Sequence, residues 1–458
     1  MVCVAREVAE LQHWSGRQRL SVFKRIIPER AVATALRGSA HRGSDDCPRV
    51  PDVFMVWFVI ALGLFCRHCY RQVYRWLLPF KRRDIPGRST LCMARQRVGV
   101  APLVRLAAAV VKLLADPAAN PGAFYRGMRL MALDGFVQDV PDHPANDRAF
   151  GRPGNQRSPG AFPQVRVVGL VECGTHVFWR FLIKGCRASE QRMTGPLLRR
   201  LLRDMLLMWD RGFLSYEHVR QVVGRHAQLL ARIKNNLIFK PVEALGDGSY
   251  LSKIYRNAAD RNADRDGILV RIIEYTLDDP GRPGTGERHR LLTTLLDPKL
   301  DPAATLVELY HARWEEELGI DEVKTHELQR PVLRSQTPAG VVQEVYGLML
   351  AHYVLRATMH EAAGAAPVPV SPLRLSFTAT LTILQCRLPE CPRGTVGRRR
   401  WWDDLIAEIG EEVIPPRRDR VNPRVIKKQQ SKWPKKRPEH YHCPQPTKKF
   451  RESIVVLR

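Results

Sequence analysis

Cysteine is scarce in this sequence of 458 residues, which contains ten cysteines scattered along its length. That number excludes a dense disulfide framework, and Cys66-x-x-Cys69 lacks the second pair of thiols that a four-cysteine zinc site requires. Long apolar runs are also missing, since the longest, 53–66, has 14 residues and a bilayer span needs ~20. Residues 1–30 contain no signal-peptide hydrophobic segment. We therefore expect a cytoplasmic protein without membrane contact, with a buried helix at 53–66.

Acidic residues are the second shortage, because 46 Asp and Glu stand against 73 Lys and Arg, a formal net charge of +27 at pH 7. Such an excess favours a polyanionic partner, since binding neutralises phosphates and releases their counterions. Arginine-rich sequences from GC-rich genomes reach the same excess without binding nucleic acid. Residues 416–458 hold 14 Lys and Arg against three acidic residues. Their charge and proline content predict a tail that is largely disordered when free and binds DNA non-specifically.

Residues 1–120 are predicted to form a helical domain. Apolar periodicity predicts its helices at 30–36, 51–65, 67–78 and 101–114. A basic stretch between them contains Lys81, Arg82, Arg83, Arg88, Arg95 and Arg97. A domain of this kind can place a helix in a DNA groove. A helical domain with a solvated arginine face gives the same pattern, so both interpretations stand on composition alone.

The pattern changes to strands after a linker at 117–122. Strands are expected at 129–133, 165–172, 177–183 and 206–209, with a helix at 196–205 capped by Thr194 before the last of them. Three strands, a helix and a further strand predict an α/β domain. Three more strand-like runs, at 228–233, 268–276 and 290–296, predict a β-rich insertion at about 226–303. A helix capped by Thr337 is expected to extend to 366.

Two aspartates follow short apolar runs. Asp134 comes after 130–133 and Asp210 after 206–209, each with a glycine close behind. A carboxylate just past a buried strand lies at the rim of a sheet, where ligands of open α/β sheets bind, although a single aspartate there is more commonly a turn residue. With Glu317 they supply three carboxylates, the hard oxygen ligands that Mg²⁺ or Mn²⁺ requires.

Glu317 belongs to a stripe of four residues between 309 and 327. Tyr310, Arg313, Glu317 and Lys324 have offsets of 0, 3, 7 and 14, which at about 100° per residue fall within a ~60° sector of one helix. The stripe carries a carboxylate flanked by an aromatic ring and two cations, facing outward or into a cleft. A solvated helix with an Arg–Glu pair at i,i+4 spacing is the alternative interpretation.

The spacing Y-x2-R-x3-E-x6-K that these four residues fill resembles the signature of the insertion-sequence-4 family of transposases. The likeness extends to Tyr310–Trp314, to 332–346 and to the region from Ile27 to Arg97, and it covers roughly residues 20–385. It implies a ribonuclease-H-like catalytic core with an Asp-Asp-Glu triad, filled here by Asp134, Asp210 and Glu317. It also implies that an all-α domain precedes the core and a basic, partly disordered tail follows it.

The resemblance leads us to expect three domains: a helical DNA-binding domain at 1–120, the catalytic domain at 121–370 and a C-terminal region at 371–458. Two Mg²⁺ or Mn²⁺ ions would be held by Asp134, Asp210 and Glu317. Tyr310, Arg313 and Lys324 would contact DNA phosphates or sugars. The implied activity is cleavage at terminal inverted repeats of double-stranded DNA and strand transfer into target DNA by a cut-and-paste mechanism, by a homodimer acting at the nucleoid.

Two other functions stay open at this point. A metal-dependent nuclease on the same fold would cut DNA without joining it, and the sequence does not distinguish it from a transposase. A domesticated DNA-binding protein with an inactive site is the second alternative, and the intact triad and signature argue against it.

Overall fold

The structure is a computed structural model that describes residues 19–38, 50–77, 85–155, 158–281, 284–312, 314–392, 394–415 and 446–457, without the side chains of 155, 158–159 and 314–317. The chain forms two compact units. The first consists of Met1–Gly127, Asp134–Met193 and Glu315–Ile414, and the second of Met128–Leu133, Thr194–Trp314 and Pro415–Arg458. The consecutive domains expected from the sequence stay a prediction, because these units follow spatial contacts and not sequence order.

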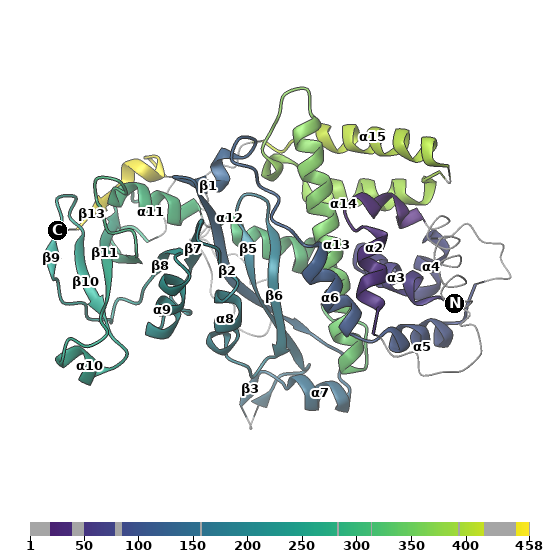
Figure 1. The fold of residues 1–458 in the computed structure, drawn as a ribbon, viewed down its shortest axis with the longest axis horizontal. Helices are drawn as coiled ribbons and strands as arrows, with labels where there is room; N and C mark the ends of the chain where they lie inside the picture. The colour runs from purple at the N-terminus through teal and green to yellow at the C-terminus, as the bar shows by residue number, and fades with distance from the viewer. Residues whose placement is uncertain are drawn as a thin grey trace, which may run out of the picture. The chain divides into compact units, whose positions relative to one another are not determined.

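Helices make up the first unit before its sheet begins (Figure 1). They are η1 (Arg19–Arg25), α2 (Glu29–Leu36), α3 (Asp52–Leu64), α4 (Tyr70–Leu77), α5 (Arg88–Val98), α6 (Ala101–Val110) and η3 (Pro121–Ala123). Four of them overlap the helices expected from periodicity. The basic stretch expected between helices forms α5 itself from Arg88 onward, whereas Lys81, Arg82 and Arg83 lie outside the described residues.

The apolar run at 53–66 forms a buried helix, as its length predicted. Every residue of α3 from Phe54 to Leu64 is buried, and the helix packs on α13 (Pro338–Ala365). The two helices approach at glycines, because a Cβ on Gly63 would lie 2.6 Å from the Gly347 carbonyl oxygen. Thr337 caps α13 by accepting a hydrogen bond from the Gly340 amide at 3.2 Å, which confirms the expected cap.

No helix in the described part of the chain is both long enough and apolar enough to cross a membrane.

The first unit also contains a small sheet. Strand β5 (Gln164–Glu172) pairs antiparallel with β6 (Val177–Gly185) through a turn at 173–176, and β5 neighbours the second half of β2 (Met128–Asp139). The unit is completed by α7 (Pro144–Phe150), the β3 (Gly154–Asn155) and β4 (Ser158–Pro159) hairpin, α12 (Trp314–Asp321), the π-helix η4 (Glu322–Glu327), η5 (Pro372–Arg374), α14 (Phe377–Arg387), η6 (Leu388–Glu390) and α15 (Thr395–Glu411).

The second unit is built on a sheet that begins with the first half of β2. Its strand order is β2, β7, β8, β12, β11, β10, β9. The remaining strands and helices are β7 (Met205–Trp209), β8 (Gln228–Arg232), β9 (Glu243–Ala244), β10 (Tyr250–Ile254), β11 (Ile268–Leu277), β12 (His289–Thr293), α9 (Tyr216–Gly224), α10 (Ala258–Asn262) and α11 (Ala303–Ala312). β2, β7 and β8 are parallel, whereas β8 to β12 and onward are antiparallel.

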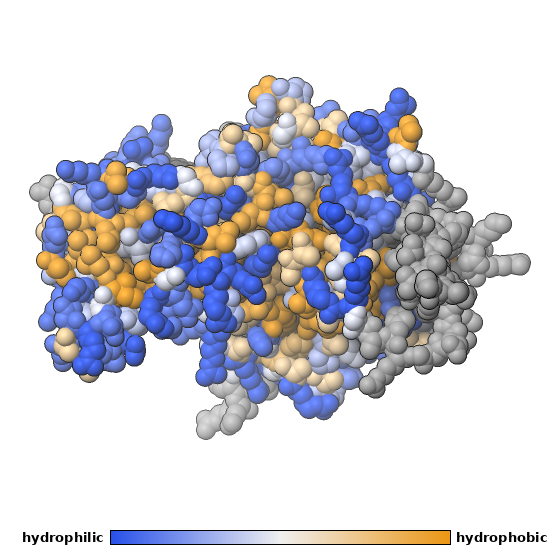
Figure 2. Space-filling view, in the orientation of Figure 1, coloured by the Kyte–Doolittle hydropathy of each residue, from blue (hydrophilic) through white to orange (hydrophobic). Residues whose placement is uncertain are grey.

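The β-rich insertion therefore continues the sheet of the second unit. Figure 2 shows hydrophobic residues gathered on the viewed face over β10 and β11. Large apolar side chains in this region are exposed, among them Ile238 at 84% and Val242 at 59%.

One helix differs from the expectation of 196–205 with a cap at Thr194. Helix α8 spans Glu190–Leu198 and contains Pro196 in its interior. Ser189 precedes it, and its hydroxyl accepts a hydrogen bond from the Arg192 amide at 3.3 Å, so the cap lies five residues earlier than expected. The helix ends early because the chain must become extended to enter β7 at Met205.

The last part of the basic tail has regular structure, and the prediction of a largely disordered tail for 416–458 stays a prediction. Residues 446–457 are described and form η8 (Phe450–Ser453) and β13 (Ile454–Val456), whereas 416–445 lie outside the described residues. β13 pairs antiparallel with β11, with Ile454 opposite Leu277. The Phe450 ring stacks on His311 of α11 with centroids 3.4 Å apart. Asp279 fixes the start of the segment by accepting the Thr447 amide at 3.1 Å.

Deleting residues 446–458 is expected to expose the end of β11. One edge of β11 pairs with β12, up to Tyr275. The other edge pairs with β10 at Ile268–Ile272 and with β13 at Tyr275–Leu277. Amide hydrogen exchange in 276–278 should therefore accelerate in the truncated chain, while 268–272 stays protected as an internal control. Unchanged exchange at 276–278 would show that β13 does not protect this edge.

Candidate active site

The two aspartates are delivered by a parallel pair of strands in register. Leu133 of β2 lies opposite Trp209 of β7, and this is the last pair in their ladder. Asp134 and Asp210 are the next residues in the two strands' sequences. Trp209 and the residues around it are buried because parallel strands bury both faces. The two apolar runs end at positions 133 and 209, so the carboxylates of Asp134 and Asp210 follow at the same level of the paired strands.

Asp134 differs from its predicted setting, which was just past the end of a strand at 129–133. It lies inside β2, which continues to Asp139 because its second half pairs in the first unit. Asp134 instead marks the residue where pairing with β7 ends. Its Oδ1 accepts the Gly135 amide at 2.7 Å. A Cβ on Gly135 would lie 2.8 Å from the Val167 carbonyl oxygen, so the position beside Asp134 has no space for a side chain.

Asp210 follows β7 directly, as predicted, and is half-buried. Its Oδ1 is buried and has no hydrogen-bond partner among the described residues. A buried carboxylate oxygen without a partner is unfavourable unless a cation or donor satisfies it. The oxygen therefore has the environment that a hard divalent cation requires of a ligand.

Tyr310 of α11 is 7% exposed, and its hydroxyl donates a hydrogen bond to the Trp209 carbonyl at 3.3 Å. The residue was expected on a stripe that faces outward or into a cleft. Its ring is buried, and its hydroxyl is bonded to the residue before Asp210. Its role in binding DNA stays a prediction. The sequence pattern could not separate these settings, because a tyrosine suits both an apolar core and a polar contact.

The single helix expected from Tyr310 to Lys324 is a succession of elements. α11 ends at Ala312, Arg313 lies outside the described residues, and α12 continues into the π-helix η4. In η4 the Leu328 amide donates to the Val323 carbonyl five residues back, at 3.0 Å. The wider π-turn changes the rotation per residue, so a rotation of 100° per residue does not predict the direction of Lys324 relative to Glu317. Lys324 is half-buried.

The side chain of Glu317 lies outside the described residues, although its backbone belongs to α12. Among the side chains that are described, no group of three or more His, Cys, Asp or Glu residues could hold a metal ion. The predicted metal site depends on Glu317 and stays a prediction.

A buried charge cluster anchors η4 in the first unit. Glu322 accepts hydrogen bonds from Arg356 Nε at 2.9 Å and pairs with His176 Nδ1 at 2.9 Å and His352 Nε2 at 3.3 Å. Burial alone would raise the pKa of Glu322, but the charges of Arg356 and His176 hold it well below its usual value. His352 and Arg356 belong to α13, so this carboxylate ties the signature segment to the longest helix.

Glu327, at the other end of η4, is buried without such partners. Neither carboxylate oxygen has a hydrogen bond within the described part of the chain. Burial, and then the charge of Glu322, raise its pKa well above the usual 4.5, so its carboxyl group keeps its proton to higher pH than an exposed glutamate does. Neither glutamate was predicted from the sequence. The available signal was a histidine and an arginine at i,i+4 spacing within the otherwise apolar stretch of α13.

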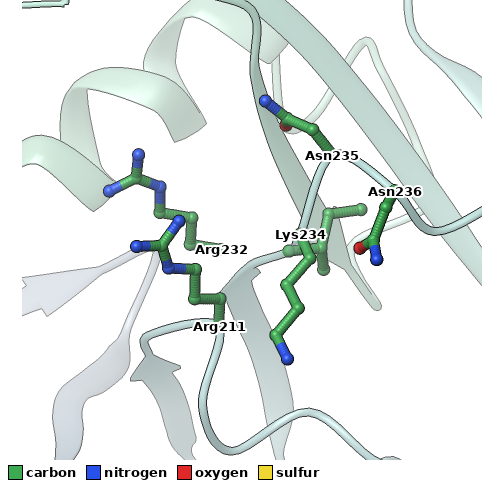
Figure 3. A pocket seen from close by; sticks show the side chains of 6 residues that line it. Arg211, Arg232, Lys234, Asn235 and Asn236 are labelled. Carbon is green, nitrogen blue, oxygen red and sulfur yellow. The ribbon is translucent and has the colours of Figure 1, made fainter.

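A cationic pocket of about 320 Å³ lies in the second unit, beside the end of β7. It is lined by Arg211, Arg232, Ile233, Lys234, Asn235 and Asn236, and Figure 3 shows the two arginine side chains pointing the same way. Arg211 follows Asp210, and both Arg211 and Lys234 are exposed without a partner in the described residues. Three cations and two amides without a carboxylate suit an anionic ligand such as a phosphate. No pattern in the sequence predicted this pocket, because its lining residues come from the ends of two strands that are neighbours only in the folded sheet.

Comparison with known proteins defines the class. A family model described as the transposase DDE domain matches residues 125–354, half of the chain, and the protein therefore belongs to this family. A second model, described as the insertion element 4 transposase N-terminal, matches residues 17–108. Within the family, the chain is thus a DNA transposase of the insertion-sequence-4 type, an enzyme of DNA cleavage and strand transfer.

Two relatives come from Escherichia coli K12. Transposase InsG for insertion sequence element IS4 is 28% identical over 396 residues, which are 84% of this chain and 87% of that protein. Putative transposase InsZ is 28% identical over 139 residues, 29% of this chain and 44% of that one. One solved structure is also similar, the cryo-EM structure of the piggyBac transposase synaptic complex with hairpin DNA. The match covers 88% of this chain and 87% of the piggyBac chain, with 11% sequence identity and a TM-score of 0.40.

Replacing Glu322 by glutamine is expected to lower the free energy of unfolding by about 3 to 5 kcal/mol, because the buried Arg356 loses its counter-charge. The matched Glu327→Gln variant keeps an uncharged side chain at a position whose pKa is raised, and it should not be destabilised. The contribution of Glu327 to stability falls as pH rises above 4.5, since the unfolded state then releases the proton that the folded state retains.

The difference in the free energy of unfolding between Glu327→Gln and the wild type, in favour of the variant, should therefore grow with pH. Urea denaturation of both variants between about pH 5 and pH 8 measures the two effects. Equal losses in the two variants would show that the charge of Glu322 does not stabilise the fold.

Proposed function

We propose that this transposase cleaves DNA at the terminal inverted repeats of its element and joins the ends to target DNA by a cut-and-paste mechanism. Asp134, Asp210 and Glu317 are the proposed catalytic carboxylates on a ribonuclease-H-like core. The observation that carries this assignment is the in-register pairing of Leu133 with Trp209, which makes the first two carboxylates the next residues of parallel strands. Parallel strands of open α/β sheets present such positions to ligands.

Divalent metal ions, Mg²⁺ or Mn²⁺, fit the residues present. Asp134, Asp210 and Glu317 would hold two ions, and the unpartnered Oδ1 of Asp210 supports this assignment. Such ions supply activation of the attacking oxygen and stabilisation of the leaving oxygen in phosphodiester chemistry. Tyr310 keeps the end of β7 in place through its bond to the Trp209 carbonyl, so it orients Asp210 in addition to its predicted DNA contact.

Cations around these carboxylates would hold the DNA backbone. Arg313 and Lys324 belong to the signature, and Arg211 and Lys234 line the pocket beside Asp210. Guanidinium groups bind phosphate in a bidentate geometry, which fixes the strand without reading its bases. We further propose that the protein acts as a homodimer on its DNA ends, at the nucleoid.

Asp134→Ala, Asp210→Ala and Glu317→Ala should each lower strand cleavage with Mg²⁺ by more than about 100-fold, because in-line attack tolerates little displacement of the reacting groups. DNA binding should persist, since removing a carboxylate reduces repulsion of phosphate. The measurement is cleavage and joining of a labelled duplex that carries the terminal repeat, with gel analysis of the products.

Glu315→Ala and Glu316→Ala are the matched controls, because on an α-helix they point ~200° and ~100° away from Glu317. An inactive Glu316→Ala protein beside an active Glu317→Ala protein would refute the assignment of the third carboxylate. Linear fragments without joined molecules from the wild type would identify a nuclease and refute strand transfer.

Arg211→Ala is expected to weaken duplex binding several-fold and to reduce the slope of log K against log salt by about one, as the loss of one phosphate contact would. Arg220→Ala is the control, because its guanidinium is already paired with Glu217 on α9, 3.0 Å from Nε to Oε2. The readout is fluorescence anisotropy of a labelled duplex over a salt series. An unchanged slope for Arg211→Ala would exclude a phosphate contact in this pocket.

A further inference from the structure

A second cationic groove lies entirely within the first unit, and none of the residues assigned above lines it. Its volume is about 1100 Å³. One wall comes from the start of α4 and from α5, and the other from 330–337 and the first turns of α13. Segments more than 230 residues apart in the sequence therefore form its two sides. Six arginines line it, against one carboxylate.

Two of the six arginines hold the walls together. Arg95 is 4% exposed, and its guanidinium donates to Gln343 Oε1 at 3.0 Å and to Ser335 Oγ at 2.8 Å. Arg334 donates to the Cys66 carbonyl at 2.8 Å and pairs with Glu344. The ring of Tyr70 lies 5.9 Å from the Arg95 guanidinium carbon and 5.8 Å from that of Arg334. These contacts give the groove a rigid floor.

The 330–337 wall is also fixed to the sheet of the first unit. The Leu333 amide donates to the Asp139 carbonyl at 3.0 Å, and Gln138 Nε2 donates to the Pro331 carbonyl at 2.7 Å. Asn146 Nδ2 donates to the Ser335 carbonyl at 3.1 Å. Because the wall is held at three points, a ligand in the groove meets a preformed surface.

The other four arginines, Arg67, Arg71, Arg88 and Arg330, have no partner in the described part of the chain. The first three are exposed and Arg330 is half-buried. The one carboxylate of the lining, Asp142, is already paired with Arg152. The positive end of the α13 dipole, capped by Thr337, opens on the same groove. Unpaired cations on a rigid floor define a site for a polyanion with several phosphates.

We propose that this groove binds the phosphate backbone of duplex DNA, with Arg67, Arg71, Arg88 and Arg330 as its contacts and Arg95 and Arg334 as positioning residues. The proposal rests on the proposed function, because it assigns a second contact region to the same DNA substrate. Residues 330–337 come shortly after η4, which continues the chain from the helix that contains Glu317. DNA in the groove would therefore contact both the N-terminal helices and the chain segment that follows the signature residues.

The test compares Arg71→Ala with Arg75→Ala, two exposed arginines one turn apart on α4, of which only Arg71 lines the groove. Fluorescence anisotropy of a labelled duplex gives the slope of log K against log salt. Arg71→Ala and Arg330→Ala should each reduce its magnitude by about one, and the double variant by about two, while Arg75→Ala keeps the wild-type slope. Circular dichroism verifies that each variant is folded.

Slopes for Arg71→Ala and Arg330→Ala equal to those of the wild type and Arg75→Ala would overturn the groove assignment. Cleavage with Mg²⁺ in the same samples separates this result from failure of the proposed function. A wild-type chain that binds duplex and does not cleave it would refute the function, whereas cleaving variants with unchanged slopes would refute only the groove. A slope reduced equally by Arg75→Ala would show a diffuse charge effect and would also refute it.

Discussion

The parallel pairing of β2 with β7 is the constraint on which the candidate active site depends. Its last pair joins Leu133 to Trp209, so the chain itself determines that Asp134 and Asp210 come next. The buried side chains of the two strands fix this register, because a shift by one residue would turn every one of them to the other face. Tyr310 reinforces the end of β7 through the Trp209 carbonyl.

Two buried glutamates, one at each end of the π-helix η4, stabilise its position in different ways. The pKa of Glu322 is lowered because Arg356 and His176 offset its burial, whereas the pKa of Glu327 is raised because only burial and a like charge act on it. The first glutamate fixes η4 to α13 by directed hydrogen bonds, and the second fills space beside it. A π-turn is usually less stable than an α-turn, so the ion cluster helps to retain it directly after α12.

Arginine content alone says little about where this protein meets DNA, because the structure divides its arginines into two kinds. Arg95, Arg334 and Arg356 are committed to carbonyl, amide or carboxylate partners and stabilise the fold. Arg71 and Arg211 are exposed and line cationic pockets. Only the second kind can neutralise phosphates at low cost, since a committed guanidinium would have to give up an existing partner.

By itself the sequence determined the strand end before Asp210, the buried helix at 53–66, the cap at Thr337, the β-rich insertion and the family signature, whereas it placed a strand end at Asp134 where β2 continues. All of these are local, because periodicity, capping and spacing act within a few turns or strands. Tertiary structure decided the rest: Glu322 meets His176 and Arg356, Arg95 meets Gln343, and β13 pairs with β11. These partners lie far apart in the chain, and short-range patterns carry no information about which distant group will satisfy a buried charge or a strand edge.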